Sequence, residues 1–182
     1  MKRFLLFLLA VLMCLPACGK SEDNATEPSV SFGEGVSCED IMWAAVNAAH
    51  FSEDKSLEGT DTFLPDKKNF DEYEMSLWAD RLYQECEEYA LLEDYAIFYI
   101  PIAYKTYEVA VLKGKSADDA AKLEKVLQRR KESLASGDKG FYDPNFESII
   151  EKAVIYTDGN YAIMIITGDV EASKAAIEAL KK

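Results

Sequence analysis

The sequence contains one histidine in 182 residues, His50, too few for the commonest catalytic and metal sites. Zinc sites usually combine several histidine and cysteine ligands, and a Ser-His-Asp triad needs a histidine beside its nucleophile. We expect His50 to be structural, at the end of a helix whose dipole favours a positive charge. The sequence also lacks a P-loop, a dinucleotide-binding fingerprint and a nucleophile elbow. It therefore predicts no metal, no cofactor and no enzymatic activity.

Basic residues are outnumbered, with 20 lysines and arginines against 33 aspartates and glutamates and a formal net charge of −13. Proteins that bind nucleic acid or anionic lipid headgroups need the opposite balance, because they neutralise phosphates. The composition therefore excludes nucleic acid as a partner. We interpret the acidic residues as a solvated, self-repelling surface that keeps the domain soluble.

Long apolar runs are also scarce, and the one at residues 4–14 is too short to span a bilayer comfortably. It follows the positive residues Lys2 and Arg3 and precedes the small residue Ala17, the three-part pattern of a signal peptide. The sequence therefore predicts an exported protein whose signal peptide comprises residues 1–17.

The stretch that follows the apolar run, Leu15-Pro16-Ala17-Cys18, resembles the bacterial lipobox. The resemblance implies that Cys18 is acylated and becomes the mature N-terminus. Pro16 is a less usual occupant of its position, and simple secretion with the same cleavage is the alternative. Each buried methylene contributes about 0.8 kcal/mol, so two or more acyl chains anchor a protein durably. We therefore expect an extracytoplasmic protein held on the membrane through Cys18.

The rest of the chain divides into a tether and one domain. Residues 18–35 comprise the lipidated cysteine and a small, polar segment without periodicity, which predicts a flexible tether. Residues 36–182 are suited to a single domain with one sizeable core. Within that domain, Cys38 and Cys86 either form a disulfide or remain reduced, Cys86 then acting as a small buried hydrophobe.

Two helices are expected first in the domain. Ser37 and Asp40 form a capping box before an apolar run, which predicts a helix from about Cys38 to His50. Residues 52–69 are expected to be a loop. A second helix is indicated by apolar residues at three- and four-residue spacing, namely Met75, Trp78, Ala79, Leu82, Cys86 and Tyr89.

The later part of the chain contains two similar segments, residues 100–115 and 154–169, which align without a gap at an offset of 154 − 100 = 54 residues. Each is followed by a helical pattern, and Asp158-Gly159 is a strong turn signal for a hairpin. We interpret them as a ββα duplication, although any hairpin followed by a helix shares this pattern. The prediction is an α+β fold with a four-stranded, mostly antiparallel sheet, both following helices on one face, and the N-terminal helices on the other.

Four segments carry a resemblance to a known family: YEVAVLKGK, LQRRKESL, FYDPNFESIIEKA and VIYTDGNYAIMIITGDVEASKAAIEAL. Over about residues 70–180 the chain is similar to uncharacterised lipoproteins of Gram-positive bacteria that are catalogued as a domain of unknown function (DUF4358-like). The resemblance supports the lipoprotein prediction. It implies no activity, cofactor or functional site.

Arg129, Arg130 and Lys131 form a basic cluster near the end of a helix that begins near Ser116. Cations there complement the helix dipole, which is the simpler interpretation. The alternative is an anion clamp, because arginine binds carboxylates and phosphates bidentately.

Ten tyrosines in one small domain suggest an amphipathic contact surface, although sheet packing is the alternative. The tyrosines singled out as ligand or partner contacts are Tyr107, Tyr142 and Tyr161. We expect a non-enzymatic interaction module for a protein, peptide or cell-wall partner. The alternative is a lipoprotein that binds a small anionic solute through Arg129 or Arg130.

Overall fold

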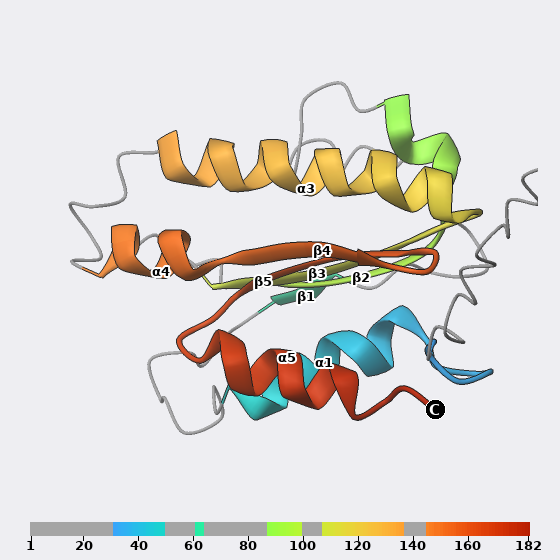
Figure 1. Cartoon of the computed structure of the whole chain (residues 1–182). Helices are drawn as coiled ribbons and strands as arrows, with labels where there is room; N and C mark the ends of the chain where they lie inside the picture. The colour runs from blue at the N-terminus through green and yellow to red at the C-terminus, as the bar shows by residue number, and fades with distance from the viewer. Residues whose placement is uncertain (1–30, 50–60, 64–86, 100–106, 137–144) are drawn as a thin grey trace, which may run out of the picture.

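A computed structural model describes residues 31–49, 61–63, 87–99, 107–136 and 145–182, and its fold is α+β (Figure 1). Its sheet is antiparallel throughout and has the order β1-β2-β3-β5-β4. The strands are β1 (Asp61–Phe63), β2 (Leu92–Tyr99), β3 (Glu108–Gly114), β4 (Val154–Asp158) and β5 (Tyr161–Ile166). The helices are α1 (Cys38–Ala48), the 3-10 helix η3 (Glu87–Leu91), α3 (Ala117–Ser136), α4 (Phe146–Lys152) and α5 (Val170–Glu178). The short strand β1 lies within residues 52–69, which the sequence predicted to be a loop, so that prediction is wrong for residues 61–63.

The first helix begins where the capping box predicts. The Ser37 side chain accepts a hydrogen bond from the backbone N–H of Asp40, and the Asp40 carboxylate accepts one from the backbone N–H of Ser37 at 2.9 Å. These bonds satisfy N–H groups that have no partner within the helix. The predicted helix is therefore confirmed as α1, while most of the predicted second helix lies outside the described residues.

Both faces of the sheet are covered, as Figure 1 shows: α3 and α4 lie on one face, and α1 and α5 on the other. Side chains alternate along each central strand, so Val109 and Ile163 face α1 and α5 while Ala110 and Met164 face α3. This burial on both faces explains why β3 and β5 are apolar at nearly consecutive positions. None of the described helices has the combined length and hydrophobicity needed to cross a membrane.

The two similar segments share their strand pattern but not their helix placement. At the offset of 54, Val109 corresponds to Ile163 and Leu112 to Ile166, and each pair faces the same side of the sheet. However, α3 and α5 cover opposite faces, whereas a ββα duplication would place both on one face. The predicted duplication is therefore wrong. Because both faces are apolar, the strand pattern does not determine which face each helix covers.

The two hairpins also differ. β4 and β5 are joined by a two-residue turn with Gly159 at φ +53°, so the predicted hairpin is confirmed with Gly159-Asn160 as its turn. In the other hairpin Tyr99 pairs with Glu108, so its first strand, β2, precedes the segment 100–115 in which the sequence placed this hairpin. Residues 100–106 lie outside the described part of the chain.

The end of the predicted tether contacts the folded domain. Phe32 forms a β-bridge with Lys181, and the backbone N–H of Lys182 donates to the carbonyl of Ser31 at 3.3 Å. The folded part of the chain therefore includes residues 31–35, which the sequence assigned to the tether. We call this segment the N-terminal arm.

Candidate functional site

The predicted anion contact Arg130 is paired with a buried carboxylate inside the domain. Arg130, on α3, reaches Glu108 at the start of β3, with the Arg130 Nη2 donating to Glu108 Oε2 at 2.7 Å and the Arg130 Nε lying 3.1 Å from both carboxylate oxygens. The Glu108 side chain is 3% exposed and that of Arg130 17% exposed. A buried carboxylate is costly unless it is neutralised and hydrogen-bonded. Arg130 therefore neutralises a buried carboxylate of the sheet, and this pairing argues against the predicted anion clamp at Arg130.

The other two basic residues of the cluster also bind groups within the domain. Arg129 lies 2.8 Å from the Glu88 carboxylate, and Lys131 donates to the carbonyl of Ala153 at 3.0 Å. The helix continues to Ser136, so the cluster does not lie at its end as predicted. Favourable interaction with the helix dipole is confined to the last turn, and these contacts are the better explanation of the cluster.

The two candidate tyrosines lie at opposite ends of the sheet. In the antiparallel β3–β5 ladder, Glu108 pairs with Ile166 at one end and Lys113 with Tyr161 at the other. These rows are roughly 17 Å apart at about 3.4 Å per residue. Tyr107, which precedes Glu108, and Tyr161 therefore do not form the predicted common aromatic surface. Tyr142 lies outside the described residues.

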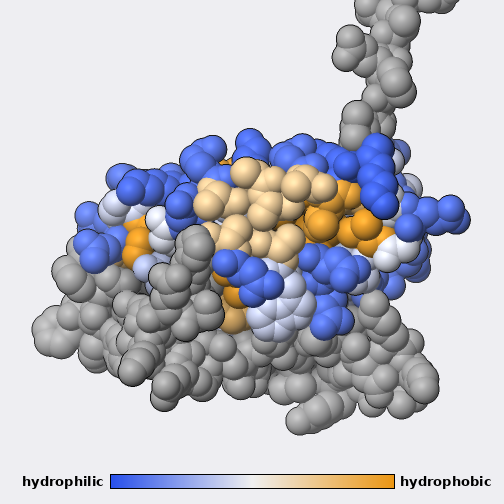
Figure 2. Space-filling model, turned by 90° about the horizontal axis from the view of Figure 1, so that it is seen from below, coloured by the Kyte–Doolittle hydropathy of each residue, from blue (hydrophilic) through white to orange (hydrophobic). Residues whose placement is uncertain are grey.

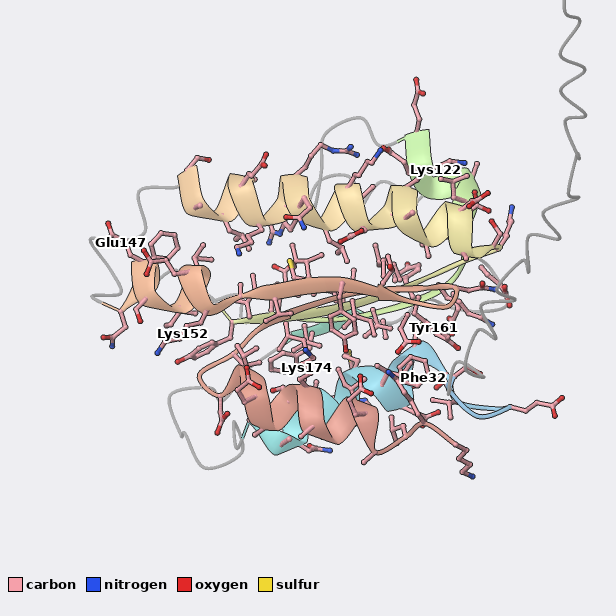
Figure 3. The ribbon with its side chains drawn as sticks, viewed as in Figure 1. Phe32, Lys122, Glu147, Lys152, Tyr161 and Lys174 are labelled. Carbon is pink, nitrogen blue, oxygen red and sulfur yellow. The ribbon has the colours of Figure 1, made fainter. Side chains whose placement is uncertain are left out.

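Tyr161 instead holds the N-terminal arm, as Figure 3 shows with Phe32 beside it. The rings of Phe32 and Tyr161 pack edge to face with centroids 5.0 Å apart, and the Tyr161 hydroxyl donates to the Val36 carbonyl at 3.2 Å. Burial raises the pKa of Tyr161 above its usual value. Its role in the domain is therefore a packing contact.

Lys181 completes this contact from the C-terminal end. Its ammonium group lies over the Phe32 ring and pairs with the carboxylates of Asp158 and Glu178. Burial lowers the pKa of Lys181, but the hydrogen bonds that its ammonium donates to both carboxylates outweigh this effect and raise the pKa overall. The arm, the β4–β5 turn and the C-terminus thus meet at one end of the sheet.

Tyr156, on β4, has a buried hydroxyl that has no hydrogen-bond partner among the described residues. Its ring lies under the Lys174 ammonium, which is 5.7 Å from the ring centroid. Burial raises the pKa of Tyr156 far above its usual value, and the charges of Glu178 and Asp158 act in the same direction. The hydroxyl is therefore protonated at neutral pH.

The cysteine and histidine predictions concern residues that are mostly outside the described part of the chain. Cys38 is fully buried at the start of α1, while Cys18, Cys86 and His50 are not described. Within the described ranges, no group of three or more histidine, cysteine or acidic side chains could hold a metal ion. The disulfide between Cys38 and Cys86 remains a prediction.

The face formed by α1 and α5 carries a hydrophobic area bordered by hydrophilic residues, as Figure 2 shows. The apolar residues that these two helices leave partly or fully exposed are mainly alanines: Ala44, Ala48, Ala172, Ala175 and Ala176. Small side chains allow the two helices to approach closely. Ser173 accordingly donates from α5 to the Ala45 carbonyl of α1 at 2.9 Å.

The arrangement from η3 to β5 can be compared with known families. Residues 88–167 match the family model Domain of unknown function (DUF4358). This match confirms the resemblance seen in the sequence. Comparisons with curated proteins and with solved structures give no significant match.

The DUF4358 match covers β2 to β5 with α3 and α4, including the Arg130–Glu108 pair. It leaves out α1 and α5, which cover the other face of the sheet. The lipoprotein character and the Gram-positive origin are not part of the match and stay predictions.

Proposed function

We propose that this protein is a membrane-anchored, extracytoplasmic lipoprotein whose folded domain is a non-enzymatic interaction module. Cys18 would carry the lipid, and residues 19–30 would link it to the N-terminal arm. Twelve residues (30 − 19 + 1) give a root-mean-square reach of roughly 17–21 Å at about 5–6 Å × √n. The domain would therefore stay within a few nanometres of the membrane.

The observation that carries the proposal is the docking of the N-terminal arm at one end of the sheet. Phe32 packs on Tyr161 and bridges to Lys181, so the chain leaves the domain from a fixed position beside the β4–β5 turn. A lipid anchor that acts through this arm would orient the domain as well as retain it. The opposite end of the sheet and the helical faces would then be available to partners.

The domain's surface supports interaction with a macromolecule better than binding of an anionic solute. Arg129 and Arg130, the residues expected to bind an anion, have carboxylate partners within the domain. Exposed apolar areas bordered by polar residues are typical of protein interaction sites, and the α1–α5 face carries such an area. We therefore favour a protein or peptide partner.

Lipidation is tested by replacing Cys18 and labelling cells with an alkynyl fatty acid. We expect the wild-type protein to be labelled and to fractionate with membranes, whereas Cys18→Ala is unlabelled and either released or left uncleaved. Cys14→Ala is the matched control, because it removes a neighbouring cysteine that the lipobox does not use. Equal labelling of Cys18→Ala and the wild type would disprove the anchor.

A further inference from the structure

The strand β4 forms one margin of the sheet. The strand order ends at β4, and no described strand lies beyond it (Figure 1). Its pairing with β5 is regular over all five residues, without a bulge. A regular edge strand presents unpaired backbone groups to which another strand can bind.

The direction of these groups follows from one hydrogen bond. The N–H of Gly114, on β3, donates to the carbonyl of Asn160 at 2.8 Å, so Asn160 directs its backbone groups toward β3. Backbone groups alternate in direction along a strand, and Tyr161, Ile163 and Ile165 therefore face β4. Their partners on β4 are Asp158, Tyr156 and Val154, respectively.

The remaining residues of β4, Ile155 and Thr157, therefore direct their N–H and C=O groups away from the sheet. Ala153, which caps α4 just before the strand, donates its N–H to the carbonyl of Ile150 and accepts a hydrogen bond from Lys131 at its own carbonyl. Thr157 is exposed, and Ile155 is half-buried.

The sequence of β4 lacks the features that usually prevent strand pairing at an edge. Such edges commonly carry proline, a bulge or charged residues within the strand. Residues 154–157, Val-Ile-Tyr-Thr, favour extended structure, and β4 has neither proline nor a bulge. Its one charged residue, Asp158, is the last of the strand and is paired with Lys181. The charged side chains near the strand, Lys174 and Lys181, lie on Tyr156 and Asp158 and do not bind the outward backbone groups.

From this geometry we propose that the outer edge of β4 binds an extended, net-cationic segment of a partner protein, which adds to the sheet as a further strand. The inference rests on the proposed interaction function and names the class of its partner. The backbone groups of Ile155 and Thr157 would supply the main-chain hydrogen bonds, as in other cases of strand addition. The net charge of −13 attracts cationic segments at long range, because opposite charges accelerate association, and Lys181 beside the strand is already paired with Asp158 and Glu178. The same charge disfavours a second copy of this chain.

The test uses the full-length protein in detergent micelles with three synthetic decapeptides as probes. The first alternates lysine and valine, the second replaces each lysine with glutamate, and the third replaces each valine with proline. We expect the lysine–valine peptide to slow hydrogen exchange at the Ile155 and Thr157 amides, and both other peptides to bind at least about tenfold more weakly. Protection at other amides only, or equal binding of the glutamate peptide, would overturn the proposal.

A pair of variants tests the same hydrogen bonds from the side of the protein. Thr157→Pro removes an outward N–H without removing a bond to β5, whereas Thr157→Val keeps that N–H. We expect Thr157→Pro, but not Thr157→Val, to bind the lysine–valine peptide about tenfold more weakly than the wild type. Equal binding of this peptide by the two variants would contradict strand addition. If Thr157→Pro does not fold, the exchange measurement on the wild type still decides.

Protection of the Ile155 and Thr157 amides that grows with protein concentration, without peptide, would identify a second copy as the occupant and overturn the proposal. Labelling of Cys18 is independent of all these measurements, so failure of strand addition is distinguishable from failure of the lipid anchor.

Discussion

Arg130 and Glu108 form a bidentate ion pair between α3 and the first residue of β3, with a shortest distance of 2.7 Å. Removing one partner of a buried pair leaves the other charge without compensation. We expect Arg130→Met to lower the free energy of unfolding by about 3 kcal/mol, measured by urea denaturation. The double variant Glu108→Leu/Arg130→Met should recover much of that loss, because neither charge is then buried alone.

The matched control is the more exposed pair between Arg129 and Glu88, in which the arginine side chain is 47% exposed. Exposed pairs contribute about 0–1 kcal/mol because water screens them. Arg129→Met should therefore change the free energy of unfolding by less than about 1 kcal/mol. Equal losses for the two arginine variants would contradict the special role of the buried pair.

The buried hydroxyl of Tyr156 predicts that Tyr156→Phe is neutral or stabilising. An unsatisfied buried polar group costs about 1–3 kcal/mol, and phenylalanine removes that group while keeping the ring under Lys174. Thermal unfolding at neutral pH measures the effect. A clear loss of stability would show that the hydroxyl has a partner in the folded protein.

The same residue predicts how stability depends on alkaline pH. The pKa of Tyr156 is raised in the folded protein, chiefly by burial, above the ordinary value of 10.0 that applies when it is unfolded. Above about pH 10 the unfolded state therefore binds fewer protons, and the free energy of unfolding falls as pH rises. Below that pH this contribution is fully present. Urea denaturation at about pH 9 and about pH 11 should show a larger loss for the wild type than for Tyr156→Phe.

The corresponding glycines of the two similar segments should differ in their tolerance of alanine. A Cβ at Gly114 would lie 2.8 Å from the backbone nitrogen of Ala120 and 2.9 Å from the Asp119 Cβ, so α3 would have to move. At Gly168 the nearest atom, the Tyr107 hydroxyl, would be at an ordinary 3.6 Å. We expect Gly114→Ala to lower the free energy of unfolding by about 1–3 kcal/mol and Gly168→Ala to lower it by less than half as much, measured by thermal unfolding. Similar losses of stability for the two variants would indicate that Gly114 and Gly168 are structurally equivalent, as the ββα duplication predicted.

The N-terminal arm should stabilise the domain through Phe32. Phe32→Ala removes the edge-to-face contact with Tyr161 and the contact with Lys181. We expect this variant to lower the free energy of unfolding by about 1–2 kcal/mol. Limited proteolysis should then cut the arm faster than in the wild type. Glu34→Ala, at an exposed position of the same arm, is the control and should leave both properties unchanged.

Local sequence signals determined several elements of this fold. The Ser37–Asp40 capping box starts α1 because both partners are three residues apart, and the turn before Tyr161 forms because glycine accepts a positive φ. The consecutive apolar residues of β3 and β5 indicated central strands covered on both faces. These features depend on neighbours along the chain, and for that reason they could be predicted.

Tertiary structure decided which face of the sheet each helix covers and which groups the candidate residues contact. An amphipathic helix buries one side, but two apolar sheet faces give it two equivalent places, so the sequence did not separate α3 from α5. The sequence predicted that Arg130 binds an anion, but in the fold it pairs with Glu108, which is 22 residues away in sequence. Tyr107 and Tyr161 lie apart because β3 and β5 are antiparallel neighbours. Such outcomes depend on contacts between distant segments, which local spacing and composition do not specify.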